Sequence, residues 1–340
     1  MILVTGGAGF VGSHVVDELV DSGEAVRVLD LRAPRRDDVD FVVGDVRDPR
    51  AVAAALRGVR AVSHQAARVG LEAGLGDAPD YVDHNDRGTA VLLAELAAAS
   101  FAGPLVLASS MVVYGEGRYA CLEHGQVRPR PRSAVDLDAG RFEPPCPACG
   151  APLAPEPIPE HAPADPRSVY AATKLHQEQL AFAYARQCGV RVVALRYHNV
   201  YGPRMPRDTP YAGVAALFGD ALRVGRAPLV FEDGGQLRDF VHVRDVARAN
   251  VQALATNEAH GAFNVCSGTP RSVGELAGAM ADAAGPHAPR PRTTGAYRLG
   301  DVRHLFADPA RARRTLGFHA REDFARAVSE LWRGNMARWS

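Results

Sequence analysis

The chain has 340 residues, and its 39 lysines and arginines are balanced by 39 aspartates and glutamates. The length is sufficient for one large or two modest domains, and the zero net charge excludes the basic surface typical of proteins that bind nucleic acid or anionic membranes. No apolar run reaches the length of a bilayer, and an apolar strand follows the N-terminus directly. We therefore expect a globular, cytoplasmic protein without a nucleic-acid or membrane partner.

The N-terminal segment predicts a strand, a glycine-rich turn and a helix. An apolar strand at residues 2–4 is followed by TGGAGFVG at residues 5–12 and then by an amphipathic run. Glycines at this spacing allow a tight turn, close approach of backbone N–H groups to a pyrophosphate, and close packing of the helix. The expected cofactor contacts are Gly6, Gly9, Phe10, Val11 and Gly12.

A second predicted strand, at residues 26–30, ends in Asp30. A carboxylate at this distance from the glycine turn can accept hydrogen bonds from both ribose hydroxyls and repels a 2′-phosphate, which favours NAD over NADP. Arg32, Arg35 and Arg36 weaken this preference, because arginine is the residue that a 2′-phosphate site would use. The expected cofactor is NAD.

Further strands are predicted at residues 41–46, 60–64 and 105–108, with a long helix over residues 81–99. Strands that alternate with helices predict an α/β fold with a doubly wound parallel sheet. Ligands bind such sheets beyond the carboxyl ends of the strands. The residues expected near the ligand there are Asp45, Val46, Ala66, Ala67 and Ser110.

The sequence SVYAATKL at residues 168–175 sets Tyr170 and Lys174 four residues apart on one face of a predicted helix. A free tyrosine titrates near pH ~10 and is a poor base at neutral pH unless a cation stabilises its phenolate. With Lys174 beside it, Tyr170 is expected to take a proton from a sugar or alcohol hydroxyl. An ordinary amphipathic helix is the alternative for this motif alone.

Residues 116–165 break the alternating pattern and are rich in proline and arginine, which indicates an inserted loop or small subdomain. This insert contains Cys121, His124, Cys146 and Cys149 as two pairs, each separated by two residues. Such pairs are typical of a tetrahedral zinc site. A disulfide, which a cytoplasmic location disfavours, and free thiols are the alternatives.

A sixth strand is expected at residues 190–197, and the chain then becomes more irregular. Helices are predicted at residues 211–224, up to 255, and from about 272, 308 and 322, with strands at 229–231 and 262–265. We expect a NAD-binding domain of residues 1–200 plus 239–266. A smaller, discontinuous α/β substrate domain would comprise residues 201–238 plus 267–336.

Taken together, the sequence resembles the extended short-chain dehydrogenase/reductases, in the nucleotide-sugar epimerase/dehydratase branch with its Rossmann fold. The resemblance covers nearly the whole chain and rests on TGGAGFVG, SSMVVYG, YAATK, RYHNVYGPR, GGQLRDFVHVRDV and RLGDVRHLFAD in this order. Within the branch, the Cys/His insert followed by DPRSVYAATK is most similar to dTDP-L-rhamnose 4-epimerases. This resemblance implies an enzyme with tightly bound NAD.

The resemblance also implies roles for individual residues. Ser110 and Tyr170 would bind the reacting hydroxyl. NAD would be held by Tyr170, Lys174 and Asn85, together with the glycine-turn residues, Asp30, Asp45, Val46, Ala66 and Ala67 named above. The expected substrate-binding residues are Ser110, Asn199, Arg204, Val214, Arg238 and Arg303. Arg238 and Arg303 would pair with the phosphates of a nucleotide sugar, which suits a guanidinium. Relatives pair two helices per subunit, so the helices after Tyr81 and Tyr170 would form a homodimer.

The implied reaction is transient oxidation of a hexose at C4 to a 4-keto sugar, rotation, and return of the hydride, on a dTDP- or UDP-hexose such as dTDP-L-rhamnose. In related dehydratases an Asp-Glu pair after the serine or threonine performs the elimination, whereas this chain has Met111 and Val112. Epimerisation is therefore expected. A 4,6-dehydratase, with Glu116 or Glu123 as substitute, or a 4-ketoreductase remains the alternative.

Two questions stay open in the sequence. His198 occupies a position that is usually aromatic in the family, where it could be a packed neutral imidazole or an added proton carrier. A non-catalytic relative that binds a sugar nucleotide or RNA is a further alternative, which the intact Ser110, Tyr170 and Lys174 disfavour.

Overall fold

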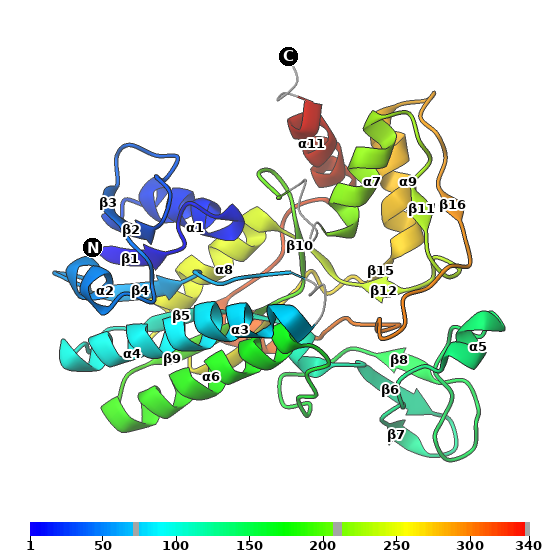
Figure 1. Cartoon of the computed structure of the whole chain (residues 1–340), viewed down its shortest axis with the longest axis horizontal. Helices are drawn as coiled ribbons and strands as arrows, with labels where there is room; N and C mark the ends of the chain where they lie inside the picture. The colour runs from blue at the N-terminus through cyan, green and yellow to red at the C-terminus, as the bar shows by residue number, and fades with distance from the viewer. Residues whose placement is uncertain (71–74, 207–212, 337–340) are drawn as a thin grey trace.

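A seven-stranded parallel sheet with the order β14-β9-β5-β4-β1-β2-β3 forms the centre of the computed structural model, which describes residues 1–70, 75–206 and 213–336 (Figure 1). Every neighbouring pair of its strands runs in parallel. The prediction of a doubly wound parallel sheet is therefore confirmed. The strands are β1 Ile2–Thr5, β2 Val26–Asp30, β3 Asp40–Val43, β4 Ala61–His64, β5 Leu105–Ser110, β9 Val192–Tyr197 and β14 Gly261–Val265.

Two layers of helices bury the faces of this sheet. Side chains alternate along each strand, so Val193 and Leu195 of β9 join the apolar cluster under α1 and α8, while Val192 and Ala194 join the cluster under α2, α4 and α6. No helix in the described ranges combines the length and the apolar character needed to cross a bilayer. The layer helices are α1 Phe10–Asp21, α8 Val243–Ala255, α2 Pro49–Ala55, α4 Gly88–Ala98 and α6 Val169–Cys188.

The segment expected as one helix over residues 81–99 is interrupted. It comprises α3 (Ala78–Tyr81), a π-helical turn η2 (Val82–Arg87) and α4, and the short 3₁₀ turn η1 (Leu75–Asp77) precedes it. The wider turn contains Asn85, whose fully buried amide bonds to the backbone of Arg68 and to Thr173 of α6. Periodicity did not reveal this interruption, because it depends on partners distant in sequence.

A second apolar core lies beside the sheet and contains Phe218, Met280 and Val328. Its helices are α7 (Val214–Arg223), α9 (Val273–Ala284) and α11 (Phe324–Met336), which Figure 1 shows side by side. The expected start of α7 at Tyr211 lies outside the described residues. Helix α10 (Ala310–Leu316) instead packs on β14 and α8 of the main sheet. Paired short strands accompany this region: β10 Asn199–Tyr201 with β13 Phe240–His242, β11 Leu229–Val230 with β16 Arg292–Thr293, and β12 Leu237–Arg238 with β15 Arg271–Ser272.

The insert forms a small antiparallel sheet that projects from the body (Figure 1). Strand β6 (Arg118–Cys121) lies between β7 (Gly125–Val127) and β8 (Ala154–Glu156), and α5 (Ala134–Asp138) follows β7. Its apolar core consists of little more than Tyr119 and Leu153 with two cysteines, Cys121 and Cys146. The insert is therefore more regular than its composition indicates, although its core is small.

Candidate active site

A cleft of about 580 Å³ opens at the carboxyl ends of the sheet strands. The turns after β1, β2, β3, β4, β5 and β9 all contribute to it. Its lining includes Gly6, Gly9, Phe10, Val11, Gly12, Asp30, Asp45, Val46, Ala66, Ala67, Ser110 and Tyr170 from the predicted site. These residues are brought together because the ends of parallel strands meet at one edge of the sheet.

The glycine turn shapes one wall of this cleft. Gly6 has a φ of +69°, and a Cβ there would lie 2.6 Å from the backbone nitrogen of Ala66. A Cβ on Gly12 would lie 2.1 Å from the carbonyl oxygen of Gly6. Helix α1 starts at Phe10 without an acidic side chain in its first turn, so its N–H groups can attract an anion. The turn therefore fits the pyrophosphate of a dinucleotide.

We expect Gly12→Ala to lower the amount of NAD that copurifies with the protein by at least tenfold, because the added methyl group would displace the turn at Gly6. Bound NAD in the purified protein, measured after denaturation, tests this. Gly278→Ala on α9 is the matched control, since a Cβ there meets nothing within 4 Å. Equal NAD content in the two variants would contradict the assignment of the turn.

Two carboxylates mark the other end of the cleft. Asp30 accepts hydrogen bonds from the backbone N–H groups of Ala8 and Arg32, both at 3.0 Å, so its position is fixed at the end of β2. The guanidinium of Arg47 donates hydrogen bonds to both carboxylate oxygens of Asp45, which holds the pKa of this carboxyl below its usual value. Arg36 is paired with Asp21 and Asp38 at 2.8 Å, so this arginine is already engaged by acids rather than offered to a 2′-phosphate.

Ser110 and Tyr170 lie together at the end of the cleft opposite to Asp30 and Asp45. Ser168 caps α6 through a hydrogen bond from the N–H of Ala171, which places Tyr170 in the first turn beside the end of β5. Burial raises the pKa of Tyr170 to about 12, and a hydrogen bond with Ser110 opposes this rise. The protein without cofactor therefore keeps this phenol protonated at neutral pH.

Lys174 lies 6.0 Å from the centre of the Tyr170 ring, and its ammonium donates a 2.9 Å hydrogen bond to the carbonyl of Ala108. Burial lowers the pKa of Lys174 to about 8, against the attraction of Glu178 and Asp86. The sequence predicts that a cation beside Tyr170 stabilises its phenolate. In the structure burial is the largest influence on the pKa of Tyr170, and Lys174 is not among the groups that lower it.

No carboxylate among the described residues lines the reacting end of the cleft. Among the described residues that line the cleft, the carboxylates are Asp30 and Asp45, at the far end. Met111 and Val112 continue from Ser110 in the 3₁₀ turn η3 (Met111–Tyr114). Glu116 is buried outside the lining, and burial raises its pKa. Glu123 is exposed beside the insert's cysteines.

Asn85 and Lys174 are expected cofactor ligands that do not line the cleft themselves. Asn85 fixes the Arg68 backbone, which does line it, and Lys174 lies beneath Tyr170. Asn199 also lies outside the lining, between two residues that belong to it, and its buried amide oxygen has no hydrogen-bond partner in the described chain. Val214 begins α7 next to Gly213, another lining residue.

The three predicted substrate arginines depart from the expectation. Arg204 is held by Asp17 and Ser13 of α1. The guanidinium of Arg303 is enclosed by Glu143, Glu232 and Asp233, at 2.6 to 2.9 Å.

Arg238 donates to the backbone carbonyls of Leu237, Val302 and Arg303. As arranged, Arg238 and Arg303 hold residues 301–304 in place, and phosphate binding by either would require these contacts to break. Sequence spacing did not reveal this, because the acids that engage Arg303 come from two distant segments.

The four predicted metal ligands do converge in the insert. Their ligand atoms all lie within 4.8 Å of one another, with 3.7 Å between the sulfurs of Cys121 and Cys149 and 3.5 Å between Cys121 Sγ and His124 Nδ1. Ligands of tetrahedral zinc are about 3.3 to 3.8 Å apart, given bonds of about 2.0 to 2.3 Å. A disulfide requires about 2.05 Å between sulfurs, so Cys121 and Cys149 are not bonded.

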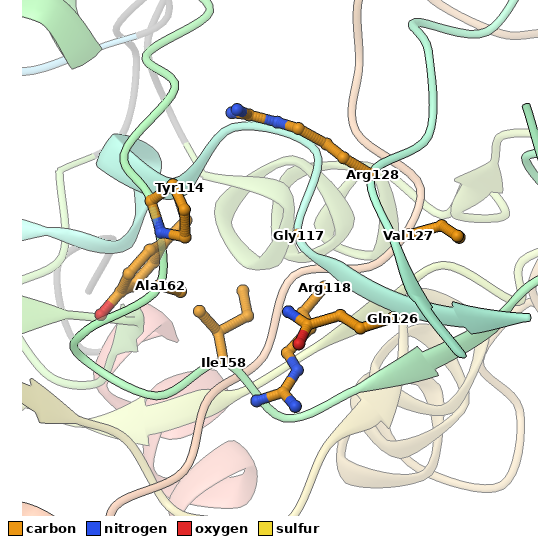
Figure 2. Close-up of a pocket in the computed structure, with 9 residues that line it drawn as sticks. Tyr114, Gly117, Arg118, Gln126, Val127, Arg128, Ile158 and Ala162 are labelled. Atoms are coloured by element: carbon orange, nitrogen blue, oxygen red, sulfur yellow. The ribbon is translucent and has the colours of Figure 1, made fainter. Parts of the chain in front are cut away.

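A second cavity, of about 260 Å³, lies within the insert, between strands β6 and β7 and residues 158–163, and shares no lining residue with the cleft. Figure 2 shows Tyr114, Ile158 and Ala162 on one side of it, with Arg118 and Gln126 opposite. Its two arginines are already paired, Arg118 with Glu156 at 2.9 Å and Arg128 with Asp165 at 2.7 Å. We assign this cavity no function.

The cleft also contains residues that sequence reasoning missed, chiefly in the loops after β4 and β9. They include Arg68, His84, Tyr197, Val200 and Met205. The hydroxyl of Tyr197 bonds to Gln65 and Asn250, which ties β9 to the loop after β4. Their position directly after predicted strands was a signal that could have identified several of them.

Comparison with known proteins agrees with this geometry. The model of the NAD dependent epimerase/dehydratase family matches residues 2–134 and 148–266. The dTDP-L-rhamnose 4-epimerase of Burkholderia thailandensis is 33% identical over 97% of this chain and 93% of its own length. The dTDP-glucose 4,6-dehydratase of an Actinoplanes species is 29% identical over 100% of this chain and 99% of its own. The crystal structure of Thermus thermophilus UDP-glucose 4-epimerase in complex with NAD matches with a TM-score of 0.77 at 30% identity, covering 98% of each chain. With this sequence and structural match over almost its whole length, the chain belongs to the NAD dependent epimerase/dehydratase family.

Proposed function

We propose that this protein is a nucleotide-sugar 4-epimerase with tightly bound NAD. The observation that carries the proposal is the composition of the reacting end of the cleft. Ser110 and Tyr170, backed by Lys174, are present there, while none of the described lining residues at that end is a carboxylate that could serve an elimination. Epimerisation needs no further proton carrier, because one phenol can take and return the same proton.

Bound NAD would supply the acceptor and later the donor of the C4 hydride, together with a positive charge beside the phenol. Gly6, Gly9 and Gly12 would hold its pyrophosphate and Asp30 its adenosine ribose. Burial raises the pKa of Tyr170 to about 12, and Lys174 together with that added charge would lower it, so that the phenolate could accept the proton of the hexose O4. Ser110 orients the same oxygen and stabilises the resulting 4-keto sugar until Tyr170 returns the proton.

The sugar nucleotide is proposed to be a dTDP- or UDP-hexose such as dTDP-L-rhamnose. The similarity to the Burkholderia enzyme supports this choice, since it extends over almost the full length of both chains. A 4,6-dehydratase is the second candidate, favoured by the similarity to the Actinoplanes enzyme. A 4-ketoreductase is the third, and it differs by consuming its cofactor.

The purified protein should interconvert C4 epimers of a dTDP- or UDP-hexose without added cofactor, and NMR of reactions with a panel of sugar nucleotides tests this. Because the hydride returns to the sugar, bound NAD should be unchanged after many turnovers. A 4-keto-6-deoxy product would instead establish the dehydratase, and stoichiometric loss of NADH or NADPH would establish the reductase.

We also propose a structural zinc ion in the insert, held by Cys121, His124, Cys146 and Cys149. Their spacing matches a tetrahedral site, and two backbone bonds, Gly150 N–H to Cys146 O and Cys146 N–H to Ala151 O, close the turn around the second pair. The ion would join β6 to the loop after α5, where apolar contacts are few.

The remaining assignments concern assembly. We propose the two-domain division expected from sequence, with α10 counted with the NAD-binding domain because it packs on β14 and α8. We propose a homodimer through α4 and α6, whose outer positions Ala90, Ala94 and Ala172 are exposed; a monomer at micromolar concentration in ultracentrifugation would contradict it. A cytoplasmic location suits a site built from reduced cysteines.

A further inference from the structure

The imidazole of His198 is buried at the reacting end of the cleft without a hydrogen-bond partner. Its side chain lines the cleft and the residue is only 3% exposed. Neither Nδ1 nor Nε2 makes a hydrogen bond of normal geometry within the described part of the chain. The nearby Asn264 interacts with the imidazole only weakly, because its own amide is already bonded to Tyr114, Ile158 and Asp308. The backbone N–H of the same residue donates to the carbonyl of Val265 at 3.1 Å, so the position of the residue is fixed.

Other buried histidines in this protein show how unusual this is. His64 bonds to Thr5 and Thr89 through its two nitrogens, and His304 bonds to Glu143 and to the N–H of Leu237. His14 bonds to the carbonyl of Pro203. Buried polar groups are almost always hydrogen-bonded, and an unsatisfied one destabilises a fold by about 1 to 3 kcal/mol. The partner of His198 is therefore to be sought in what binds the cleft.

The location of His198 narrows the choice of partner. It directly follows β9, whose last residue, Tyr197, pairs in register with Ser110 of β5. His198 thus shares the end of the cleft with Ser110 and Tyr170, whereas Asp30 and Asp45 mark the opposite end. A neutral imidazole offers one donor and one acceptor, and a sugar hydroxyl presents the complementary pair.

We propose that His198 hydrogen-bonds a hydroxyl group of the hexose and thereby helps to select the sugar; this inference rests on the proposed function. Burial lowers the pKa of His198 to about 3, and the neighbouring Arg196 adds to this effect, so the group is neutral at physiological pH. It acts as a hydrogen-bonding residue and not as an added proton carrier.

The test compares ligands with and without the hexose. Calorimetry would measure the affinities of the NAD-bound wild type, His198→Phe and His198→Gln for four ligands. These are dTDP, dTDP-L-rhamnose, UDP and UDP-glucose. Phe keeps the ring but removes both polar atoms, whereas Gln keeps a donor and an acceptor. We expect His198→Phe to bind the sugar nucleotide about 3- to 10-fold more weakly, the usual effect of one neutral hydrogen bond, and to bind the free nucleotide unchanged. His198→Gln should recover part of the loss.

Other outcomes would overturn the inference. Equal weakening of dTDP and dTDP-L-rhamnose would mean that the change is not at the hexose. A lower NAD content with unchanged sugar-nucleotide affinity would assign the imidazole to the nicotinamide, and unchanged affinities throughout would leave it a packing residue. If the wild type epimerises its substrate while His198→Phe binds it normally, this inference fails and the proposed function stands.

Discussion

Replacing Tyr170 by Phe is expected to lower kcat/KM for epimerisation by about 10³-fold, within the range for loss of a positioned acid or base. The phenol is the group proposed to take and return the O4 proton, and no carboxylate among the described lining residues at that end could replace it. The NAD content should stay the same, because the glycine turn and Asp30 are untouched. Steady-state rates and the NAD content of the purified variant measure both effects.

Tyr184→Phe is the matched control for this prediction. Tyr184 lies on the same helix, is buried away from the cleft, and has a hydroxyl without a hydrogen-bond partner in the described chain. Its variant should keep wild-type kcat/KM. Full activity of Tyr170→Phe would refute the mechanism and revive a non-catalytic role for the cleft.

The pH profile provides a second readout for the same site. Since the pKa of Lys174 is lowered to about 8, its ammonium is present below that pH and is lost as the pH rises through it. The charge that assists Tyr170 therefore disappears on the alkaline side, and wild-type kcat should decline above about pH 8. A profile that keeps rising to pH 10 would show that this cation is not required.

Cys149→Ser is expected to abolish zinc binding and to unfold the insert, while the central sheet remains folded. Zinc binding in small metallo-domains contributes on the order of 10 kcal/mol, and the insert has few buried apolar side chains to replace it. Metal analysis should find one zinc per chain in the wild type and none in the variant. Trypsin should then cleave the variant after Arg141, whose side chain is 61% exposed and which is followed by Phe142.

Cys188→Ser is the control, since Cys188 is an exposed free cysteine at the end of α6, outside the cluster. It should keep its zinc and its protease resistance. The insert also provides Arg132, paired with Glu232, and Glu143, paired with Arg303, so its unfolding should weaken sugar-nucleotide binding as well. A wild-type insert that is free of metal yet resists trypsin would contradict the zinc proposal.

The sequence by itself determined the main sheet and much of the cleft. Local signals are sufficient there, because an apolar strand followed by TGGAGFVG allows few backbone arrangements, and because parallel strands bring Asp30, Ala66 and Ser110 to one edge wherever they lie in the chain. The same holds for the four proposed zinc ligands, whose paired spacing brings each pair together locally.

What only the tertiary structure decided depends on contacts between distant segments. The partners of Arg303 come from the insert and from the loop after β11, so its enclosure by three acids could not be foreseen. The π-helical turn at Asn85 forms around the backbone of Arg68 and the side chain of Thr173. Burial, which sets the pKa values of Tyr170, Lys174 and His198, is likewise a property of the packed chain and not of any local pattern, because it depends on every segment that closes over these groups.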